Sequence, residues 1–140
     1  MTYLIDTNVV SEIAKRRRNA GVLEWLAATQ SDGHHLSVLT IGELLRGIER
    51  VRRLKDQDQV RSLERTLATI RADFRDRIAP VSLDVAQEWA RLPPGRPVPT
   101  VAALIGATAR VHGWTLVTRN TKDFAHLNVP LVNPFSEEVE

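Results

Sequence analysis

Apolar and polar positions follow two patterns along the chain, and the two patterns alternate. Short apolar runs, typical of buried strands, occupy residues 2–5, 35–38, 78–81 and 114–118, with a further candidate at 131–132. Segments of helical character lie between them, at residues 8–15, 22–30, 40–54, 56–76, 82–91 and 100–112. Because strands alternate with helices, the pattern predicts an α/β fold in which a central, mainly parallel sheet of four to five strands is covered on both faces.

The segment 56–76 has the clearest helical period. Its apolar positions, spaced by three and four, are Val60, Leu63, Leu67, Ile70 and Phe74. With the segment 40–54 it predicts a helical hairpin, and packing within the chain explains the stripe more simply than a dimer interface does. Residues 100–112 are apolar almost all round and precede Gly113, which predicts a buried helix with a glycine end. The proline-rich segment 93–99 predicts a stiff loop. Residues 137–140, three of which are glutamate, predict a loose end.

Composition narrows the class of protein. Hydrophobic residues make up 43% and charged residues 26% of the 140 positions, as in ordinary globular domains, and we expect a single domain spanning residues 1–140. No apolar run reaches the length of a membrane span, and the first residues lack a signal-peptide pattern, so a cytoplasmic protein is expected. The absence of cysteine excludes disulfides and thiolate metal sites. The four histidines have no zinc-ligand spacing and are interpreted as structural.

Basic residues are clustered although the net charge is only +2. One cluster spans residues 15–18 and another lies between residues 46 and 55, and nearly all the cations are arginine. Arginine suits bidentate contacts with phosphate groups. On charge alone, however, a solvated basic face is the simpler interpretation.

Three carboxylates follow predicted strands. Asp6 ends the first, Glu43 lies shortly after the second, and Asp123 lies shortly after the fourth. Since the carboxyl ends of parallel strands share one edge of a sheet, these acids can converge there. A cluster of carboxylates repels itself unless a cation lies among them, and hard oxygen ligands select Mg²⁺ or Mn²⁺. Such a site suits hydrolysis of a phosphodiester.

Each acid also has a structural explanation. Thr40 and Glu43 have the spacing of a helix capping box, and Asn120 and Asp123 have that of a similar local cap. Taken singly, both pairs are better explained as caps. Asp6 is different, because a carboxylate at the end of a buried strand needs a partner.

Taken together and in order, several segments resemble the PIN-domain family, specifically the VapC-type ribonuclease toxins in the branch close to FitB. The matching segments are residues 4–12, 36–44 with Gly47-Ile48, 103–109, 116–120 through Asp123-Phe124, and 133–135. No single segment is specific, but the ordered set is.

This resemblance implies an α/β/α sandwich and a Mg²⁺- or Mn²⁺-dependent endoribonuclease of a toxin–antitoxin pair. Asp6 and Glu43 match the family's first two acids, and the last acidic position falls at Asn120 or Asp123. The matching polar residues that support the site are Asn8 and Thr118. The resemblance further implies an RNA substrate, a cognate antitoxin, a homodimer and toxin–antitoxin hetero-oligomer, and contact with DNA only through the antitoxin.

The chain departs from the family pattern at Ala102, where the family usually has an aspartate that is a principal metal ligand. Alanine removes both oxygens but favours the helix, so the change spares the fold and damages the chemistry. Two explanations are open: a native alanine in a weak or silent homologue, or an inactivating substitution in a toxic nuclease. Because the other segments are intact, the second is favoured.

Two other functions compete with the impaired nuclease. A catalytically silent PIN-fold chain would serve as a binding partner in a protein complex, with DNA reached through that complex. An aspartyl phosphotransferase also begins with an aspartate at a strand end, but it needs a second aspartate two residues later, where this chain has Asn8. That reading is disfavoured.

Overall fold

The structure is a computed structural model that describes residues 1–93 and 97–137. The strands are β1 (Thr2–Ile5), β2 (Gly33–Ser37), β3 (Ile78–Ala79), β4 (Thr115–Val117) and β5 (Leu131–Val132). The helices are α1 (Thr7–Ile13), α2 (Ala20–Ala28), α3 (Val38–Arg53), α4 (Gln57–Asp73), α5 (Leu83–Ala90), α6 (Thr100–His112), α7 (Thr121–Phe124) and the 3-10 turn η1 (Ala125–Leu127). The strand and helix order confirms the predicted α/β fold.

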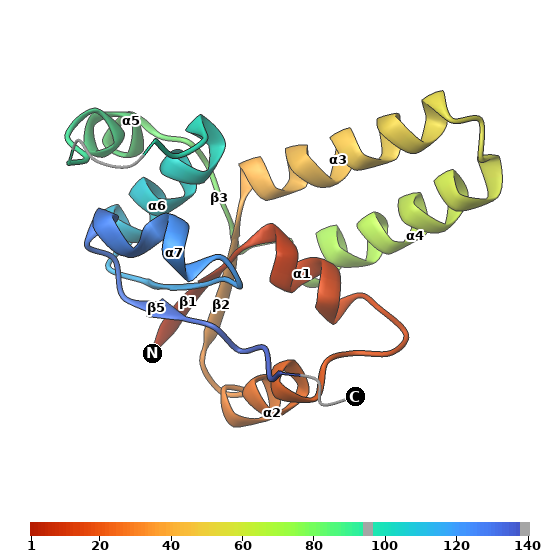
Figure 1. Cartoon of the computed structure of the whole chain (residues 1–140), viewed down its shortest axis with the longest axis horizontal. Helices are drawn as coiled ribbons and strands as arrows, with labels where there is room; N and C mark the ends of the chain where they lie inside the picture. The colour runs from red at the N-terminus through yellow and green to blue at the C-terminus, as the bar shows by residue number, and fades with distance from the viewer. Residues whose placement is uncertain (94–96, 138–140) are drawn as a thin grey trace.

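The described strands form one parallel sheet with the order β3-β2-β1-β4-β5 (Figure 1). The chain therefore builds outward from β1 in one direction through β2 and β3, and in the other through β4 and β5. The connections leave the sheet on opposite sides of the boundary between β1 and β4. At such a switch point the loops after neighbouring strands diverge, and open α/β folds place their sites there.

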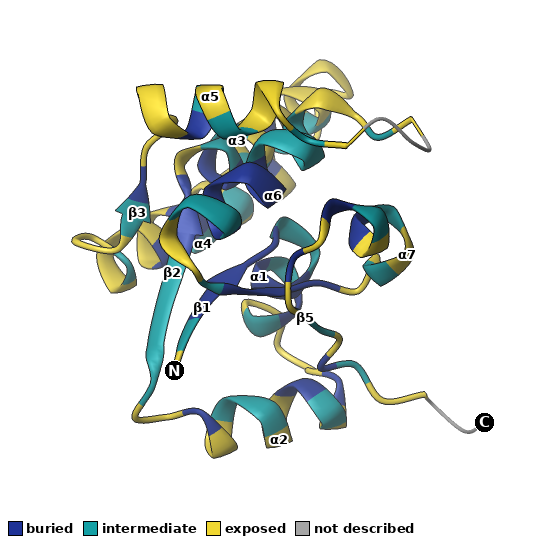
Figure 2. Ribbon diagram, turned by 90° about the vertical axis from the view of Figure 1, so that its left-hand side faces the viewer, coloured by how far each residue is buried: buried dark blue, intermediate teal, exposed yellow. Residues whose placement is uncertain are grey.

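Apolar layers cover both faces of the sheet. Along β1, Tyr3 and Ile5 pack in one cluster with residues of α1, α3 and α4, whereas Leu4 packs in a second cluster with residues of α6 and α7. This alternation follows from the two-residue period of a strand. Figure 2 shows buried residues along β1 and in α6, with exposed residues on the outer turns of α5. Since β1 is buried on both faces, its end at Asp6 is held firmly.

Helices α3 and α4 form the predicted hairpin, which projects from the sheet (Figure 1). In α4, Val60, Leu67 and Ile70 are buried in the cluster that contains Tyr3 and Ile5. The stripe is therefore satisfied by packing within the chain. Helix α6 spans the predicted residues and ends at Gly113, whose φ of 69° is the left-handed conformation that glycine adopts readily.

The structure corrects several predicted boundaries. A helix was predicted at residues 22–30, but α2 begins at Ala20, where Asn19 caps it by accepting hydrogen bonds from the backbone amides of Gly21 and Val22. Val38 was expected in a strand, but it begins α3. The short helix α7 was not predicted, because its four residues are too few to show a period.

Two predicted segments lie partly outside the described residues. Residue 93 and residues 97–99 of the predicted loop have neither helix nor strand, while residues 94–96 lie outside the described part. Residues 138–140 of the predicted loose end lie outside it as well. Within the described ranges, no helix is long and apolar enough to cross a membrane.

Candidate functional site

Asp6 lies at the switch point, directly after β1, and caps α1. Its side chain is only 7% exposed. One carboxylate oxygen accepts a hydrogen bond from the backbone amide of Thr7 at 2.9 Å, and the other accepts from the hydroxyl of Thr118 at 2.8 Å. The side-chain amide nitrogen of Asn8, Nδ2, lies 3.5 Å from that second oxygen. A buried carboxylate requires hydrogen-bond partners, and here they come from residues that follow β1 and β4.

The electrostatic environment of Asp6 disfavours its ionised form. Burial raises the pKa of Asp6, and the hydrogen bonds from Thr118 and Thr7 oppose that rise. Repulsion from Glu43 and Asp123 raises the pKa further. Two of the acids predicted from the sequence therefore act on the third, Asp6, although they are far from it in the chain. Perturbed carboxylates are typical of functional sites.

Glu43 reaches the same edge from α3. The hydroxyl of Thr7 donates to Glu43 Oε1 at 2.6 Å, and it also lies 3.4 Å from the hydroxyl of buried Thr40. Glu43 itself is exposed. Thr7 is a site residue that sequence reasoning missed, since its role depends on α3 lying across from it. The only available signal was its place next to Asp6.

The predicted capping box at Thr40 and Glu43 is wrong. Ser37 caps α3 by accepting a hydrogen bond from the backbone amide of Leu39, so Thr40 lies inside the first turn. The side chain of Glu43 turns instead toward Thr7.

The loop after β4 completes the edge. Thr118 is fully buried, donates to Asp6, and accepts a hydrogen bond from the backbone amide of Asn120 at 3.1 Å. The backbone amide of Arg119 donates to the side-chain oxygen of Asn8 at 3.2 Å. Asn120 stands at the N-cap of α7, but its side chain makes no capping hydrogen bond. Asp123 is half-buried in α7.

Ala102 lies in the first turn of α6, half-buried against the cluster that contains Leu4 and Ile105. Its neighbour Val101 lines a groove together with Glu43. The helix end that carries Ala102 is therefore next to the acidic edge, but its methyl group offers no oxygen. The first turn of α6 also contains no acidic residue.

Comparison with known proteins decides the family. The sequence profile described as "PIN domain" matches residues 3–129. The chain belongs to the PIN-domain family. The predicted family and fold class are thereby confirmed.

Several PIN proteins are similar over nearly the whole chain. Identity is 34% with the plasmid stability protein StbB of Pseudomonas syringae pv. tomato, covering 94% of this chain and 97% of that protein. It is 30% with toxin FitB of Neisseria gonorrhoeae, covering 96% and 99%. It is 28% with the VapC ribonuclease Y4jK of Sinorhizobium fredii, covering 94% and 96%. The crystal structure of FitAcB from Neisseria gonorrhoeae aligns with a TM-score of 0.81 at 30% identity, covering 95% and 98%.

The residues present do not fit a metal ion held by three acids. PIN nucleases generally use divalent metal ions, and the carboxylates here have the right hard-donor chemistry. However, the described residues contain no group of three or more His, Asp or Glu side chains placed to hold one ion. The position from which α6 could contribute a carboxylate is Ala102. The edge is acidic but incomplete.

His34, His35 and His112 take part in ring contacts away from this edge. His34 packs with Tyr3 and Trp25, while Trp114 stacks on His35 and on His112 at ring distances of 4.2 and 4.1 Å. Burial lowers the pKa of both His34 and His35. These contacts agree with a structural interpretation. His34 and His35 lie within β2, which begins at Gly33.

Proposed function

We propose that this PIN protein is the toxin of a toxin–antitoxin pair, an RNA-hydrolysing enzyme whose activity is impaired by Ala102. The observation that supports the proposal is that Asp6, Glu43 and the loop that carries Asp123 lie at one edge of the sheet, where burial and repulsion from the other two acids raise the pKa of Asp6. Repulsion among neighbouring carboxylates does not stabilise the fold, whereas a phosphodiester hydrolase uses such acids. The proposed site residues are Asp6, Glu43, Asn120 and Asp123, with Asn8 and Thr118 as supporting residues.

The partners follow from the same proposal. The substrate is RNA, and the regulator is a cognate antitoxin that covers the acidic edge. Toxin FitB and the VapC ribonuclease are named relatives, and one similar structure is that of FitAB bound to a DNA fragment, at 28% identity and a TM-score of 0.77. We therefore propose a single domain over residues 1–140 that forms a homodimer and a hetero-oligomer in the cytoplasm, with DNA contacted through the antitoxin.

Dependence on Mg²⁺ or Mn²⁺ is part of the proposal and centres on Ala102. In the complete site, a carboxylate at position 102 would hold the ion together with Asp6, Glu43 and Asp123. An aspartate there also suits the fold, because a negative charge in the first turn of a helix interacts favourably with the helix dipole. Ala102→Asp should therefore restore chemistry without a loss of stability.

The test compares the chain with its Ala102→Asp variant, each freed of antitoxin. We expect Ala102→Asp to cleave structured RNA with Mg²⁺ or Mn²⁺ at least a hundredfold faster than the unchanged chain. Ala102→Asn is the matched control, because it adds one oxygen without the charge and should stay slow. Combining Ala102→Asp with Asp6→Asn should abolish the gain. No cleavage by Ala102→Asp, with the fold intact by circular dichroism, would overturn the nuclease proposal.

The second candidate is a catalytically silent binding partner, which the missing oxygen at Ala102 favours. Calorimetry with Mn²⁺ separates the two candidates. The nuclease proposal expects Ala102→Asp to bind Mn²⁺ measurably more tightly than the unchanged chain. Equal, weak binding by both proteins would favour the silent partner, because the acids would then not form a metal site even when complete.

A further inference from the structure

A polar pocket lies beside the acidic edge. It has a volume of about 720 Å³, and six of the residues that line it are Lys15, Arg17, Arg119, Asn133, Phe135 and Ser136. We call it the Arg119 pocket. We propose that it is a subsite for one unpaired nucleotide of the RNA, next to the bond that is cleaved. This inference rests on the proposed function, whose site residues lie elsewhere.

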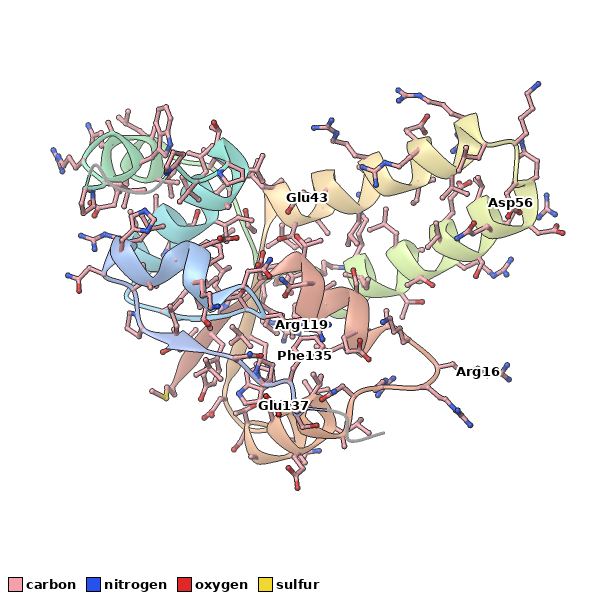
Figure 3. All side chains as sticks on the ribbon, in the orientation of Figure 1. Arg16, Glu43, Asp56, Arg119, Phe135 and Glu137 are labelled. Atoms are coloured by element: carbon pink, nitrogen blue, oxygen red, sulfur yellow. The ribbon has the colours of Figure 1, made fainter. Side chains whose placement is uncertain are left out.

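The backbone connects the Arg119 pocket to the acidic edge. Arg119 follows Thr118, whose hydroxyl holds Asp6, and its own amide donates to Asn8. We call residues 133–137 the C-terminal segment. In Figure 3, Arg119 and Phe135 lie together between α1 and this segment, which runs over α2. A strand of RNA with one phosphate at Asp6 would therefore have its neighbouring nucleotide at the pocket.

The pocket offers a flat surface for a base. The Arg119 guanidinium lies over the Phe135 ring, 4.5 Å from the ring centre. Unpaired RNA bases stack on aromatic rings and on guanidinium planes, and any base can do so. Asn133 and Ser136 supply polar groups at the wall of the pocket. A volume of this size is in the range of pockets that hold small organic groups.

The charges of the pocket favour a phosphate group. Glu12 and Glu137 also line it and oppose the cations. The Glu12 carboxylate, however, accepts hydrogen bonds from Lys15 Nζ and from the backbone amide of Asn19, both at 2.9 Å. Because Glu12 and Lys15 pair with each other, the charges left in the lining are those of Arg17, Arg119 and exposed Glu137. The pocket therefore has an excess of positive charge. Cations beside a stacking surface are the usual means of binding single-stranded nucleic acid.

A protein segment from an antitoxin is the competing occupant. The pocket lacks the apolar wall that would bury a helix face, since its lining is mainly charged and polar. The Arg119 guanidinium over the Phe135 ring, and the position of the pocket next to the acids, match a nucleotide better. We therefore assign it to RNA and treat the antitoxin as an outcome of the test.

The test measures RNA binding without cleavage. A fluorescein-labelled single-stranded oligoribonucleotide is titrated with the antitoxin-free chain in EDTA, and fluorescence anisotropy gives the Kd. Loss of one stacked base costs about tenfold in affinity, so we expect Arg119→Ala to raise the Kd about tenfold. Arg119→Lys keeps the charge and loses the plane, so it should recover only part of the loss. Phe135→Leu, which removes the aromatic plane, should weaken binding in the same way.

The chain contains a matched control for charge. Arg16 and Arg17 are neighbours in one exposed loop, but only Arg17 lines the pocket, and Figure 3 shows Arg16 directed away from it. We expect Arg17→Ala to raise the Kd about fivefold and Arg16→Ala to change it less than twofold. Equal losses for both arginines, or no loss with Arg119→Ala in a folded protein, would overturn the subsite. Unchanged RNA binding with lost antitoxin binding would overturn it in favour of the antitoxin.

Cleavage kinetics separate this proposal from the proposed function. In an Ala102→Asp background, Arg119→Ala should raise KM and leave kcat nearly unchanged. If Ala102→Asp cleaves RNA but Arg119→Ala changes neither Kd nor KM, the subsite is wrong and the nuclease stands. If Ala102→Asp is inactive while the Kd pattern holds, the nuclease is wrong and the nucleotide site stands.

Discussion

Thr118 donates its hydroxyl hydrogen to Asp6 across 112 positions of sequence, at 2.8 Å. The two residues follow Val117 and Ile5, which are paired in the parallel register of β4 and β1. The backbone amide of Asp6 also donates to the carbonyl of Val117 at 2.9 Å, so the ladder continues to the site. The carboxylate of Asp6 is thus fixed by the same strand pairing that builds the core.

Thr118→Val should destabilise the protein by about 2 kcal/mol, the usual cost of losing a hydrogen bond to a charged group. The variant keeps the shape of the side chain but leaves Asp6 without its hydroxyl donor and the amide of Asn120 without its acceptor. Urea unfolding at pH 7 measures the loss. Thr118→Ser, which keeps the hydroxyl, should lose much less. An equal loss for both variants would mean that packing of the methyl group, not the hydrogen bond, is what matters.

Asp6→Asn should make the protein more stable at neutral pH. Burial raises the pKa of Asp6 in the folded state, so the folded protein binds the proton more tightly than the unfolded chain does. The free energy of unfolding therefore falls as pH rises from the unfolded pKa through the folded pKa, and the variant lacks this fall. We expect Asp6→Asn to raise the free energy of unfolding by about 1 kcal/mol at pH 7, in the range of single stabilising substitutions. At pH 3.5 the increase should be smaller.

Urea unfolding at the two pH values tests this sign. Asp76→Asn, which makes the same chemical change in an exposed turn, is the matched control. A difference between Asp6→Asn and the unchanged chain that is the same at both pH values would contradict the assignment.

Gly21→Ala should separate α2 from the C-terminal segment. An added Cβ would lie 2.4 Å from the backbone nitrogen of Ser136 and 2.5 Å from the backbone oxygen of Pro134. Backbone atoms cannot move aside cheaply, so we expect a loss of about 1–3 kcal/mol in urea unfolding. Gly47→Ala is the control within helix α3, where nothing lies within 4 Å of the added atom. It should stabilise the protein by about 0.5–1 kcal/mol, and a loss at Gly47 as large as that at Gly21 would contradict the argument.

Glu12→Gln should weaken the protein at neutral pH and have less effect in acid. The hydrogen bond from Lys15 is the main cause that lowers the pKa of Glu12, and the amide of Asn19 contributes too. A lowered carboxyl pKa gives stability that is present above the unfolded pKa and is lost as pH falls through the folded pKa. Thermal unfolding at pH 7 and pH 3 should show the difference between the two proteins shrink in acid. An equal difference at both pH values would show that charge has no part in it.

Much of this arrangement was predictable because it depends on local pattern. The alternation of strands and helices predicted a parallel sheet, and parallel strands necessarily bring Asp6 and the loop after β4 to one edge. The stripe from Val60 to Phe74 predicted α4, and Gly113 predicted the end of α6. These inferences needed only spacing and the conformational preferences of single residues.

Other features of the site could not be predicted from the local sequence. Whether Glu43 caps its own helix or faces the acids depends on where α3 begins, and Ser37 rather than Thr40 caps it. Thr7 looked unremarkable in sequence, yet its hydroxyl holds Glu43. Both facts depend on how α1 and α3 pack on the sheet.

The sequence by itself determined which side chains are available. These are the acids, the methyl group of Ala102, and the apolar runs that form the strands. Only the tertiary structure decided which of them meet. Asp6 has a raised pKa because long-range packing buries it and brings Glu43 and Asp123 toward it. The Arg119 pocket likewise forms only because the C-terminal segment returns to α1 and places Phe135 under Arg119. Burial and charge proximity are properties of the folded chain, since both depend on distances that sequence separation does not measure.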